Sequence, residues 1–491
     1  MEITQASKSA AVRARLNHPV IDADGHILEF EPDFLDYLSQ VGGTKVVQQY
    51  TAWCDRTAKK GYSWYEMSWQ ERRDRRAKRP SWWALPAKNT LDRATATLPK
   101  LLYERLDEIG LDFTILYPTV ALFMVHIEDK ELRRACCRAY NTLLADVFRE
   151  YADRMTPVAI IPMHTPEEAI EELEYAVKAL SMKAILIAGY VMRPIRAEAA
   201  TETFWLDTYG LDSEYNYDPF WAKCVELGVA PTAHDVGRDW GSRQSISNFM
   251  YNHIGHFAAA DEALCKSLFM GGITRRFPTL KFALLEGGVA WACSLYADLI
   301  GHWEKRNPKA VQNYNPANLD RNLLVDLFAR YGGKMVEGKL DQAGRWGFGL
   351  DWQDHPDNAA MLDEWAPCQI ERAEDIRDLF VPNFYFGCEA DDPINAWAFN
   401  SRVNPFGARL KIILGSDIGH WDVPDMTEVI EEAYELVEKG LITEENFRDF
   451  VFTNPVTLHA SMNPNFFKGT AVEKEVEKLL AEEVSKSEKV S

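Results

Sequence analysis

Eight short apolar runs, separated by amphipathic stretches, constrain the fold of this chain more than any other feature. In chain order they are PVIDADGHI, LDFTILYPT, MTPVAIIPM, MKAILIAG, GVAPTAHD, LKFALLEGG, FYFGCEADD and LKIILGSD. Strand patterns that alternate with helix patterns are typical of βα units, which place their strands in parallel. Eight such units predict an α/β fold of the (β/α)8 (TIM) barrel type. A doubly wound open sheet is disfavoured, because the first run continues into DADGHILE and not into a glycine-rich phosphate loop.

The repeat also predicts how the chain is divided. The predicted parts are an N-terminal arm (1–18), a barrel domain (19–463) and a charged C-terminal tail (464–491). Three long stretches inside the barrel domain depart from the repeat, at about 29–99, 235–270 and 307–382. Long segments of this kind commonly form lids, pocket walls or oligomer contacts. The first contains the basic cluster ERRDRRAKR at 71–79, which we interpret as a solvated helix face or as a contact with an acidic neighbouring subunit.

Charge and composition exclude several classes of partner. The chain has 54 Lys and Arg against 74 Asp and Glu, a formal net charge of −20, which repels nucleic acids and anionic membranes. No apolar run is long enough to cross a bilayer, and the N-terminal residues lack the apolar stretch of a signal peptide. The eight cysteines form no CxxC pair, as is typical of reduced thiols. We therefore expect a cytoplasmic protein with a small-molecule substrate, and neither nucleic acid nor membrane as a partner.

Carboxylates and imidazoles gather where the apolar runs end. In chain order these residues are Asp24, His26, His234, Glu286, Asp417 and, three residues later, His420. In a barrel the carboxyl ends of the strands form the active face. Asp24 and His26 are two residues apart and share a strand face, on which Asp22 lies deeper. Together with His234 and Asp417 they predict a mixed nitrogen and oxygen site of the kind that suits Zn, Mn, Fe or Co.

This arrangement resembles the amidohydrolase superfamily. The resemblance is carried by the DxH motif of Asp24 and His26, by the lone His234, by the GSDxxH motif of Asp417 and His420, and by TNPVTLHA near the end of the chain. It covers about residues 19–463 and is greatest to the amidohydrolase-related branch that includes aminocarboxymuconate-semialdehyde decarboxylase. The resemblance implies that Asp24, His26, His234 and Asp417 bind a divalent metal ion (Zn, Mn or Fe), with one or two ions per chain.

Two positions depart from the family pattern. Many relatives have HxH on the first strand, where this chain has Asp24, and the decarboxylase has a proton-handling His after the sixth strand, where this chain has Glu286. Glu286 is therefore a candidate ligand for a second metal ion. For catalysis the resemblance and the residue types indicate Asp417 as ligand and general base, with Glu286 or His420 moving a proton. Arg193, after the fourth run, is a candidate to hold a substrate carboxylate with its two-pronged guanidinium.

Three functions stay open on these residues. The leading one is a metal-dependent hydrolase or decarboxylase (carbon–carbon lyase) that acts on a small carboxylated molecule through metal-activated water or a metal-polarised substrate. The second is an oxygen-dependent hydroxylase with a dinuclear Fe or Mn/Fe site on the same fold. The third is a non-catalytic partner subunit. Dimers are common among similar barrels, so we expect a homodimer or a hetero-oligomer with a related subunit.

Overall fold

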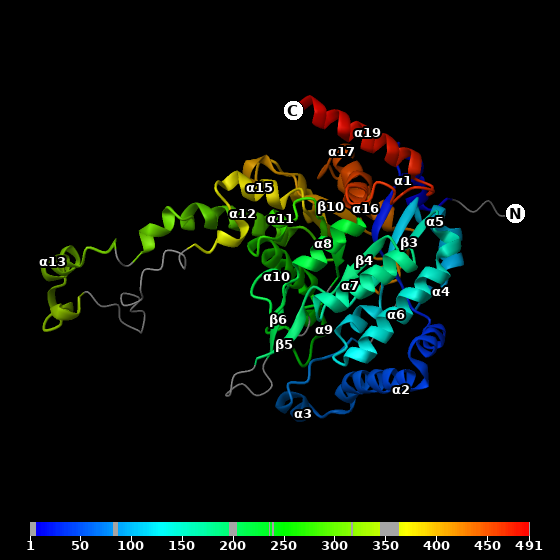
Figure 1. Cartoon of the computed structure of the whole chain (residues 1–491), viewed down its shortest axis with the longest axis horizontal. Coiled ribbons are helices and arrows are strands. Elements are labelled where there is room, and N and C mark those ends of the chain that lie inside the picture. The colour runs from blue at the N-terminus through cyan, green and yellow to red at the C-terminus, as the bar shows by residue number, and fades with distance from the viewer. Residues whose placement is uncertain are drawn as a thin grey trace.

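In the computed structural model of the chain, eight parallel strands form the centre of the fold (Figure 1). The structure describes residues 6–81, 87–195, 204–234, 236–237, 240–315, 318–343 and 363–490. In their order around the sheet, the strands are β1 (Ile21–Ile27), β2 (Phe113–Pro118), β3 (Met155–Ile161), β4 (Ala184–Ile187), β7 (Pro231–Ala233), β8 (Phe282–Leu284), β9 (Phe384–Glu389) and β10 (Lys411–Gly415). Each pairs in parallel with the next, so the predicted (β/α)8 barrel is confirmed.

The first and last strands of this sheet lie side by side. The backbone N–H of Asp417 donates to the carbonyl of Asp24 at 3.1 Å, and the N–H of His26 donates to the carbonyl of Ile418 at 2.9 Å. The buried Asp22 carboxylate accepts a further bond from the backbone N–H of Ser416 at 3.0 Å. The ring of strands is therefore nearly closed, which makes the candidate residues of β1 and β10 neighbours.

Amphipathic helices cover the outside of the barrel and explain why its strands are almost wholly buried. They are α5 (Pro99–Ile109), α6 (Lys130–Val147), α7 (Pro166–Glu174), α8 (Asp218–Leu227), α11 (Ile273–Arg276), α12 (Ala290–Arg306), α15 (Ala373–Phe380), α16 (Val429–Glu438) and α18 (Asn454–Ala460). Local signals start and end them. Thr165 caps α7 by accepting from the N–H of Glu168, with Pro166 at the first helical position. Gly110 ends α5 in the left-handed conformation at φ 89°.

The segments outside the repeat add further elements. They are α1 (Lys8–Arg15), α2 (Glu31–Glu66), α3 (Trp69–Asp74), α4 (Thr90–Thr97), the hairpin of β5 (Val191–Pro194) and β6 (Phe204–Asp207), α9 (Phe249–His253), α10 (His256–Met270), α13 (Arg321–Tyr331), α17 (Glu444–Arg448) and α19 (Glu473–Val490). The hairpin after β4 is not anticipated by the sequence pattern. Part of the third predicted insertion, 344–362, lies outside the described residues.

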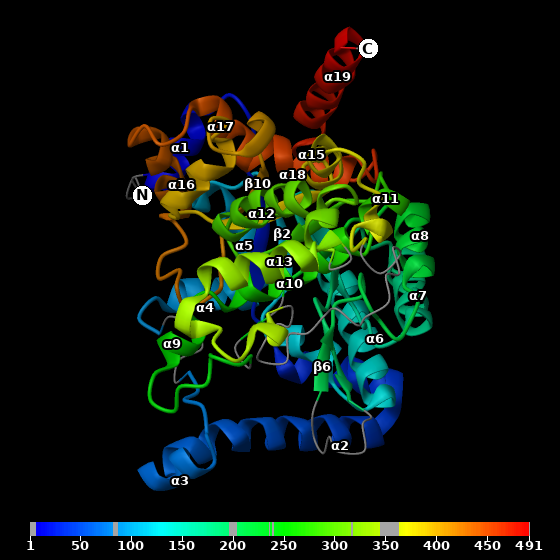
Figure 2. The ribbon, with the colours of Figure 1, turned by 90° about the vertical axis from the view of Figure 1, so that its left-hand side faces the viewer.

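These additions are placed asymmetrically. Figures 1 and 2 both show α2, α3, α9 and the β5–β6 hairpin at one end of the molecule, opposite α17 and α19. Figure 1 also shows α13 projecting away from the barrel. Helix α2 packs along α6 and is interrupted at Gly43, where φ is 72°. None of the described helices combines the length and the apolar composition that crossing a bilayer requires.

Candidate metal centre

The residues singled out at the ends of the apolar runs meet at the carboxyl end of the barrel. Asp24 and His26 belong to β1, His234 directly follows β7, and Glu286 and Asp417 lie two residues beyond β8 and β10. His26 and His234 are at most 2% exposed, and Asp417 is 5% exposed. The structure therefore gathers candidate ligands from the ends of four strands into one buried site.

The distances within this group fit a metal ion. The Nε2 atoms of His26 and His234 lie 3.2 Å apart. From Nε2 of His26 it is 3.6 Å to Oδ1 of Asp24 and 3.4 Å to Oδ1 of Asp417. Two donors at about 2.1 Å from one ion, subtending about 90–110°, lie about 3.0–3.4 Å from each other. Asp24, His26 and His234 are thus spaced as ligands of a common cation, whereas Asp417 groups with His26, Glu286 and His420.

Protonation and burial favour the same interpretation. Nδ1 of His26 lies 3.1 Å from the carbonyl oxygen of Pro118, which can accept its proton and leave the Nε2 lone pair facing the site. Burial raises the pKa of Asp24 well above its ordinary value and lowers the pKa of His26 well below its own. Oδ1 of Asp24 is buried without a hydrogen bond to any residue in the described part of the chain. A buried carboxylate without a partner is costly, and a divalent cation at this point would satisfy it.

Glu286 and His420 extend the site on its other side. Oε2 of Glu286 lies 3.0 Å from Nε2 of His234, and Nδ1 of His420 lies 2.5 Å from Oδ1 of Asp417. The His420 ring stacks on that of His26 at a centroid distance of 3.7 Å, and burial lowers the pKa of His420 to about 3. Glu286, Glu389 and Asp422 form one potential ligand set, and two further sets share His26. The two that share His26 are Asp24, His26 and His234, and His26, Glu286, Asp417 and His420.

A pocket of about 370 Å³ adjoins the centre at Glu286. Four carboxylates line it, from Glu286, Glu389, Asp392 and Asp422. Burial and the neighbouring Glu286 and Asp422 raise the pKa of Glu389 to about 8. The aromatic rings of Phe257 and Trp421 complete its walls, together with His253. The volume lies within the range of small-molecule sites.

Sequence reasoning missed Trp421 and Asp422 as parts of this site, although they directly follow His420. No pattern in the chain distinguishes an aromatic residue that lines a pocket from one that packs in the core. The position just after a candidate ligand was the one signal available.

The structure places Arg193 away from this pocket, in β5. Its Nε donates to Asp207 at 3.0 Å, Nη1 donates to the carbonyl of His164 at 2.8 Å, and Nη2 donates to the hydroxyl of Tyr217 at 2.9 Å. The guanidinium is thus engaged with the protein through all three nitrogens. The expectation that Arg193 holds a substrate carboxylate receives no support from this arrangement.

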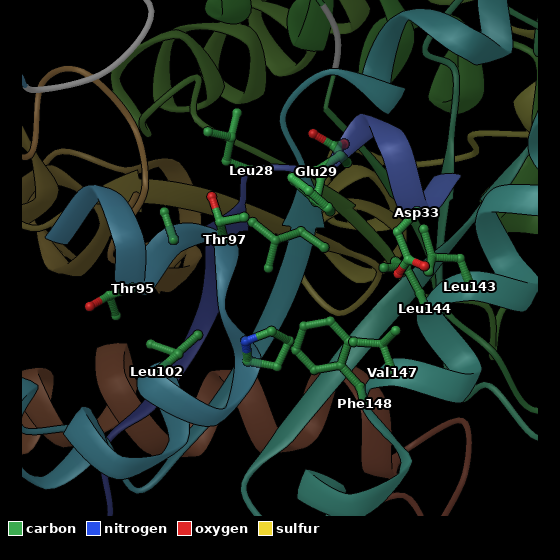
Figure 3. A pocket seen from close by; sticks show the side chains of 14 residues that line it. Leu28, Glu29, Asp33, Thr95, Thr97, Leu102, Leu143, Leu144, Val147 and Phe148 are labelled. Carbon is green, nitrogen blue, oxygen red and sulfur yellow. The ribbon is translucent and has the colours of Figure 1, made fainter. Parts of the chain in front are cut away.

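A second, apolar pocket lies between the start of α2, α5 and α6 (Figure 3). Its volume is about 60 Å³, and Leu102, Leu143 and Phe148 are among its lining residues. None of the candidate ligands lines it, and it is too small for most metabolites. The pocket beside Glu286 is therefore the better candidate for a substrate.

Comparison with known proteins places the chain in a family. The Amidohydrolase family model matches residues 21–334, more than half of the chain. A curated relative, the 2-keto-4-carboxy-3-hexenedioate hydratase of Sphingobium sp., is 27% identical over 194 residues, which are 38% of this chain and 50% of the relative. The matched region thus spans about half the length of that relative.

Solved structures align along most of the chain. An amidohydrolase from Mycobacterium avium subsp. paratuberculosis K-10 is 17% identical with a TM-score of 0.51, and the alignment covers 90% of this chain and 99% of that chain. A dihydroxybenzoic acid decarboxylase from Polaromonas sp. JS666, solved with manganese and 2-nitroresorcinol, is 16% identical with a TM-score of 0.48, covering 90% and 97%. On the strength of the family match, this chain is a member of the amidohydrolase family of enzymes.

Proposed function

We propose that the chain is a divalent-metal-dependent enzyme that brings water to a small organic substrate, as a hydrolase or a hydratase. The observation that carries this proposal is the position of Glu286. Its carboxylate lies 3.0 Å from the candidate ligand His234 and also lines the adjoining pocket. A carboxylate between a metal centre and a substrate pocket is well placed to act as a general base.

In this proposal each side chain of the site has a separate role. Asp24, His26 and His234 would hold the ion, and Asp417 would lie beside it, 3.4 Å from Nε2 of His26. The bound ion would act as a Lewis acid that lowers the pKa of water and polarises a substrate oxygen. Glu286 accepts a proton on the pocket side of the centre. His420, 2.5 Å from Asp417, orients that carboxylate.

Two observations favour water chemistry over decarboxylation. The decarboxylase that the sequence resembles uses a His where this chain has Glu286, and the curated relative is named as a hydratase.

The acidic pocket also restricts how a carboxylated substrate could be oriented. Its described lining contains no Lys or Arg, so a substrate carboxylate would point towards the metal centre and away from the pocket.

The overlapping ligand sets favour a second candidate function. If Glu286, Asp417 and His420 hold a second ion beside the first, the oxygen-dependent hydroxylase with a dinuclear Fe or Mn/Fe site becomes the better interpretation. The non-catalytic partner subunit is disfavoured, because a subunit that has lost turnover has no need of a complete ligand set.

Elemental analysis of the purified chain and of Glu286→Gln separates these functions. One ion per chain in both proteins, with catalysis lost in the variant, supports the water chemistry. Two ions including Fe, reduced to one in the variant, support the hydroxylase. Absence of bound metal after reconstitution with Zn, Mn and Fe contradicts both.

A substrate screen in ¹⁸O-labelled water then identifies the reaction class. Label in the product indicates hydrolysis or hydration, release of carbon dioxide indicates decarboxylation, and consumption of oxygen indicates hydroxylation. The matched control is Glu304→Gln, on an exposed residue of α12, which should behave as the unmodified chain.

A further inference from the structure

The basic cluster at 71–79 packs onto a buried tryptophan, Trp64, near the end of α2. Trp64 is 6% exposed. The guanidinium of Arg72 lies 3.7 Å from the centre of its ring, and the guanidinium of Arg79 lies 5.4 Å away. Arg72 also donates from Nε to the carbonyl of Trp64 at 2.9 Å. Cation–π contacts of this kind hold the indole in place, so the cluster is more than a solvated helix face.

The Trp64 indole and Arg79 donate hydrogen bonds to three consecutive residues of the second insertion. Nε1 of Trp64 donates to the carbonyl of Ile246 at 3.2 Å. The backbone N–H of Arg79 donates to the carbonyl of Ser245 at 3.0 Å, and Nη1 of Arg79 donates to the carbonyl of Ser247 at 2.8 Å. The first insertion therefore satisfies the backbone of the second over a sequence separation of more than 160 residues.

Residues 245–247 are followed in the chain by residues that line the candidate substrate pocket. Ser245 is tied to Asn252 of α9 by two hydrogen bonds, from its N–H to Oδ1 at 2.7 Å and from Nδ2 to its carbonyl at 2.9 Å. The residues that follow, His253 and Phe257, line the pocket. The Phe257 ring meets the ring of His234 edge to face at a centroid distance of 5.3 Å. Residues 245–247 are thus connected, through Asn252 and the residues that follow it, to a ring that contacts a candidate metal ligand.

We infer that Trp64 and Arg79 are positioning residues, which clamp residues 245–247 and thereby set the pocket wall formed by His253 and Phe257. The inference rests on the proposed function in one respect, that this pocket receives the substrate. It also assigns an intramolecular role to Arg72 and Arg79 of the basic cluster, while contact of the cluster with an acidic neighbouring subunit stays a prediction.

Hydrogen–deuterium exchange tests the clamp directly. Trp64→Phe keeps a ring for the two arginines and removes the N–H donor, whereas Arg79→Ala removes the side-chain bond to Ser247. Both should raise amide exchange at 245–257 by about tenfold while leaving the barrel strands unchanged. Arg79→Lys should restore part of the protection. Arg75→Ala, an exposed residue of the same cluster, is the matched control. Unchanged exchange at 245–257 in both variants would overturn the proposal.

Two metal-directed probes then test the effect on the pocket. Acetohydroxamate needs only the ion, whereas benzohydroxamate also places a ring against the pocket wall. In metal-loaded protein, Trp64→Phe and Arg79→Ala should each weaken the binding of benzohydroxamate by about tenfold relative to the binding of acetohydroxamate. The metal content should not change. An unchanged ratio despite faster exchange would show a merely structural tether and overturn the positioning role. Lack of metal in the unmodified chain would contradict the proposed function, and the exchange data would still decide the clamp.

Discussion

Glu286 and Asp417 occupy the same rare backbone conformation, with φ of 60° and 51°. Each lies two residues beyond its strand, at the ends of β8 and β10. A non-glycine residue held in this left-handed region costs on the order of 1–3 kcal/mol. The two candidate carboxylates beside the histidines are therefore presented by strained backbone, as is common where a site dictates geometry.

Replacing Asp417 by glycine should raise stability while it abolishes metal binding. Glycine adopts the positive φ without strain, so the free energy of unfolding of the metal-free protein should increase by about 1 kcal/mol. Urea denaturation of the metal-free proteins measures this. Asp24→Gly is the matched control, because Asp24 lies inside β1 without a positive φ and glycine should destabilise a strand there. A metal-free Asp417→Gly less stable than the unmodified chain would refute the strain argument.

Asp22 is predicted to hold the barrel closed behind the metal centre. Its Oδ1 accepts from the backbone N–H groups of Asp24 and Ser416, and its Oδ2 accepts from the hydroxyls of Thr114 and Ser416 at 2.7 Å each. Asn has the same shape as Asp, but its amide NH₂ group would replace one of the two accepting oxygens. That NH₂ group would then face two hydrogen-bond donors. Asp22→Asn should therefore lower the free energy of unfolding by about 2–4 kcal/mol.

Metal affinity should fall in the same variant, because Ser416 precedes the candidate ligand Asp417. Urea denaturation and manganese titration calorimetry measure the two effects. Thr114→Val removes one of the four bonds and should cost about 1 kcal/mol with affinity retained. Equal stability of Asp22→Asn and the unmodified chain would contradict the role.

The ends of the strands could be predicted from the sequence because burial imposes an apolar run and a site interrupts it with charge. Asp24, His26, His234, Glu286 and Asp417 were all located in this way. The strand register was harder to predict than the ends of the strands. Pairing between β1 and β2 shifts between Asp22 and Gly25, and a Cβ at Gly25 would lie 2.4 Å from Oδ2 of Asp22. This irregularity depends on packing against β2, which simple alternation does not encode.

The pocket and the insertions could not be predicted for a related reason. The partners of Arg193 are a carboxylate, a carbonyl and a hydroxyl from three different segments, so nothing in its local sequence separates a structural arginine from a substrate ligand. The contact of Trp64 with Ile246 likewise joins residues 182 apart. Such contacts follow from how the insertions fold back on the barrel.

Arg193 is predicted to stabilise the fold without affecting the metal centre. It pairs with Asp207, which is fully buried. Arg193→Ala would leave that carboxylate without its cation and should cost about 3–5 kcal/mol, with metal content per chain unchanged. Guanidinium denaturation and elemental analysis measure the two effects, and Arg193→Lys should recover part of the loss. A stable Arg193→Ala protein would return the residue to a binding role.

His459 is predicted to make the protein sensitive to acid. It is 2% exposed and stacks on Phe466 at a centroid distance of 4.3 Å. Burial lowers its pKa to about 3, whereas the pKa in the unfolded chain is about 6.5. Above pH 6.5 the residue is neutral in both states and contributes no pH dependence. As the pH falls further, the unfolded chain takes up a proton that the folded chain refuses, so stability is lost by about 1.4 kcal/mol per pH unit down to about pH 3.

His459→Phe keeps the stacking and removes the titrating group. The free energy of unfolding of both this variant and the unmodified chain is measured in urea at pH 7, 6 and 5. The difference in favour of the variant should therefore increase at each step below pH 6.5. His302→Phe, on an exposed position of α12, is the control and should follow the unmodified chain. Parallel curves for His459→Phe and the unmodified chain would show that His459 takes up its proton at the same pH in both states, and that its burial does not set the acid limit of the fold.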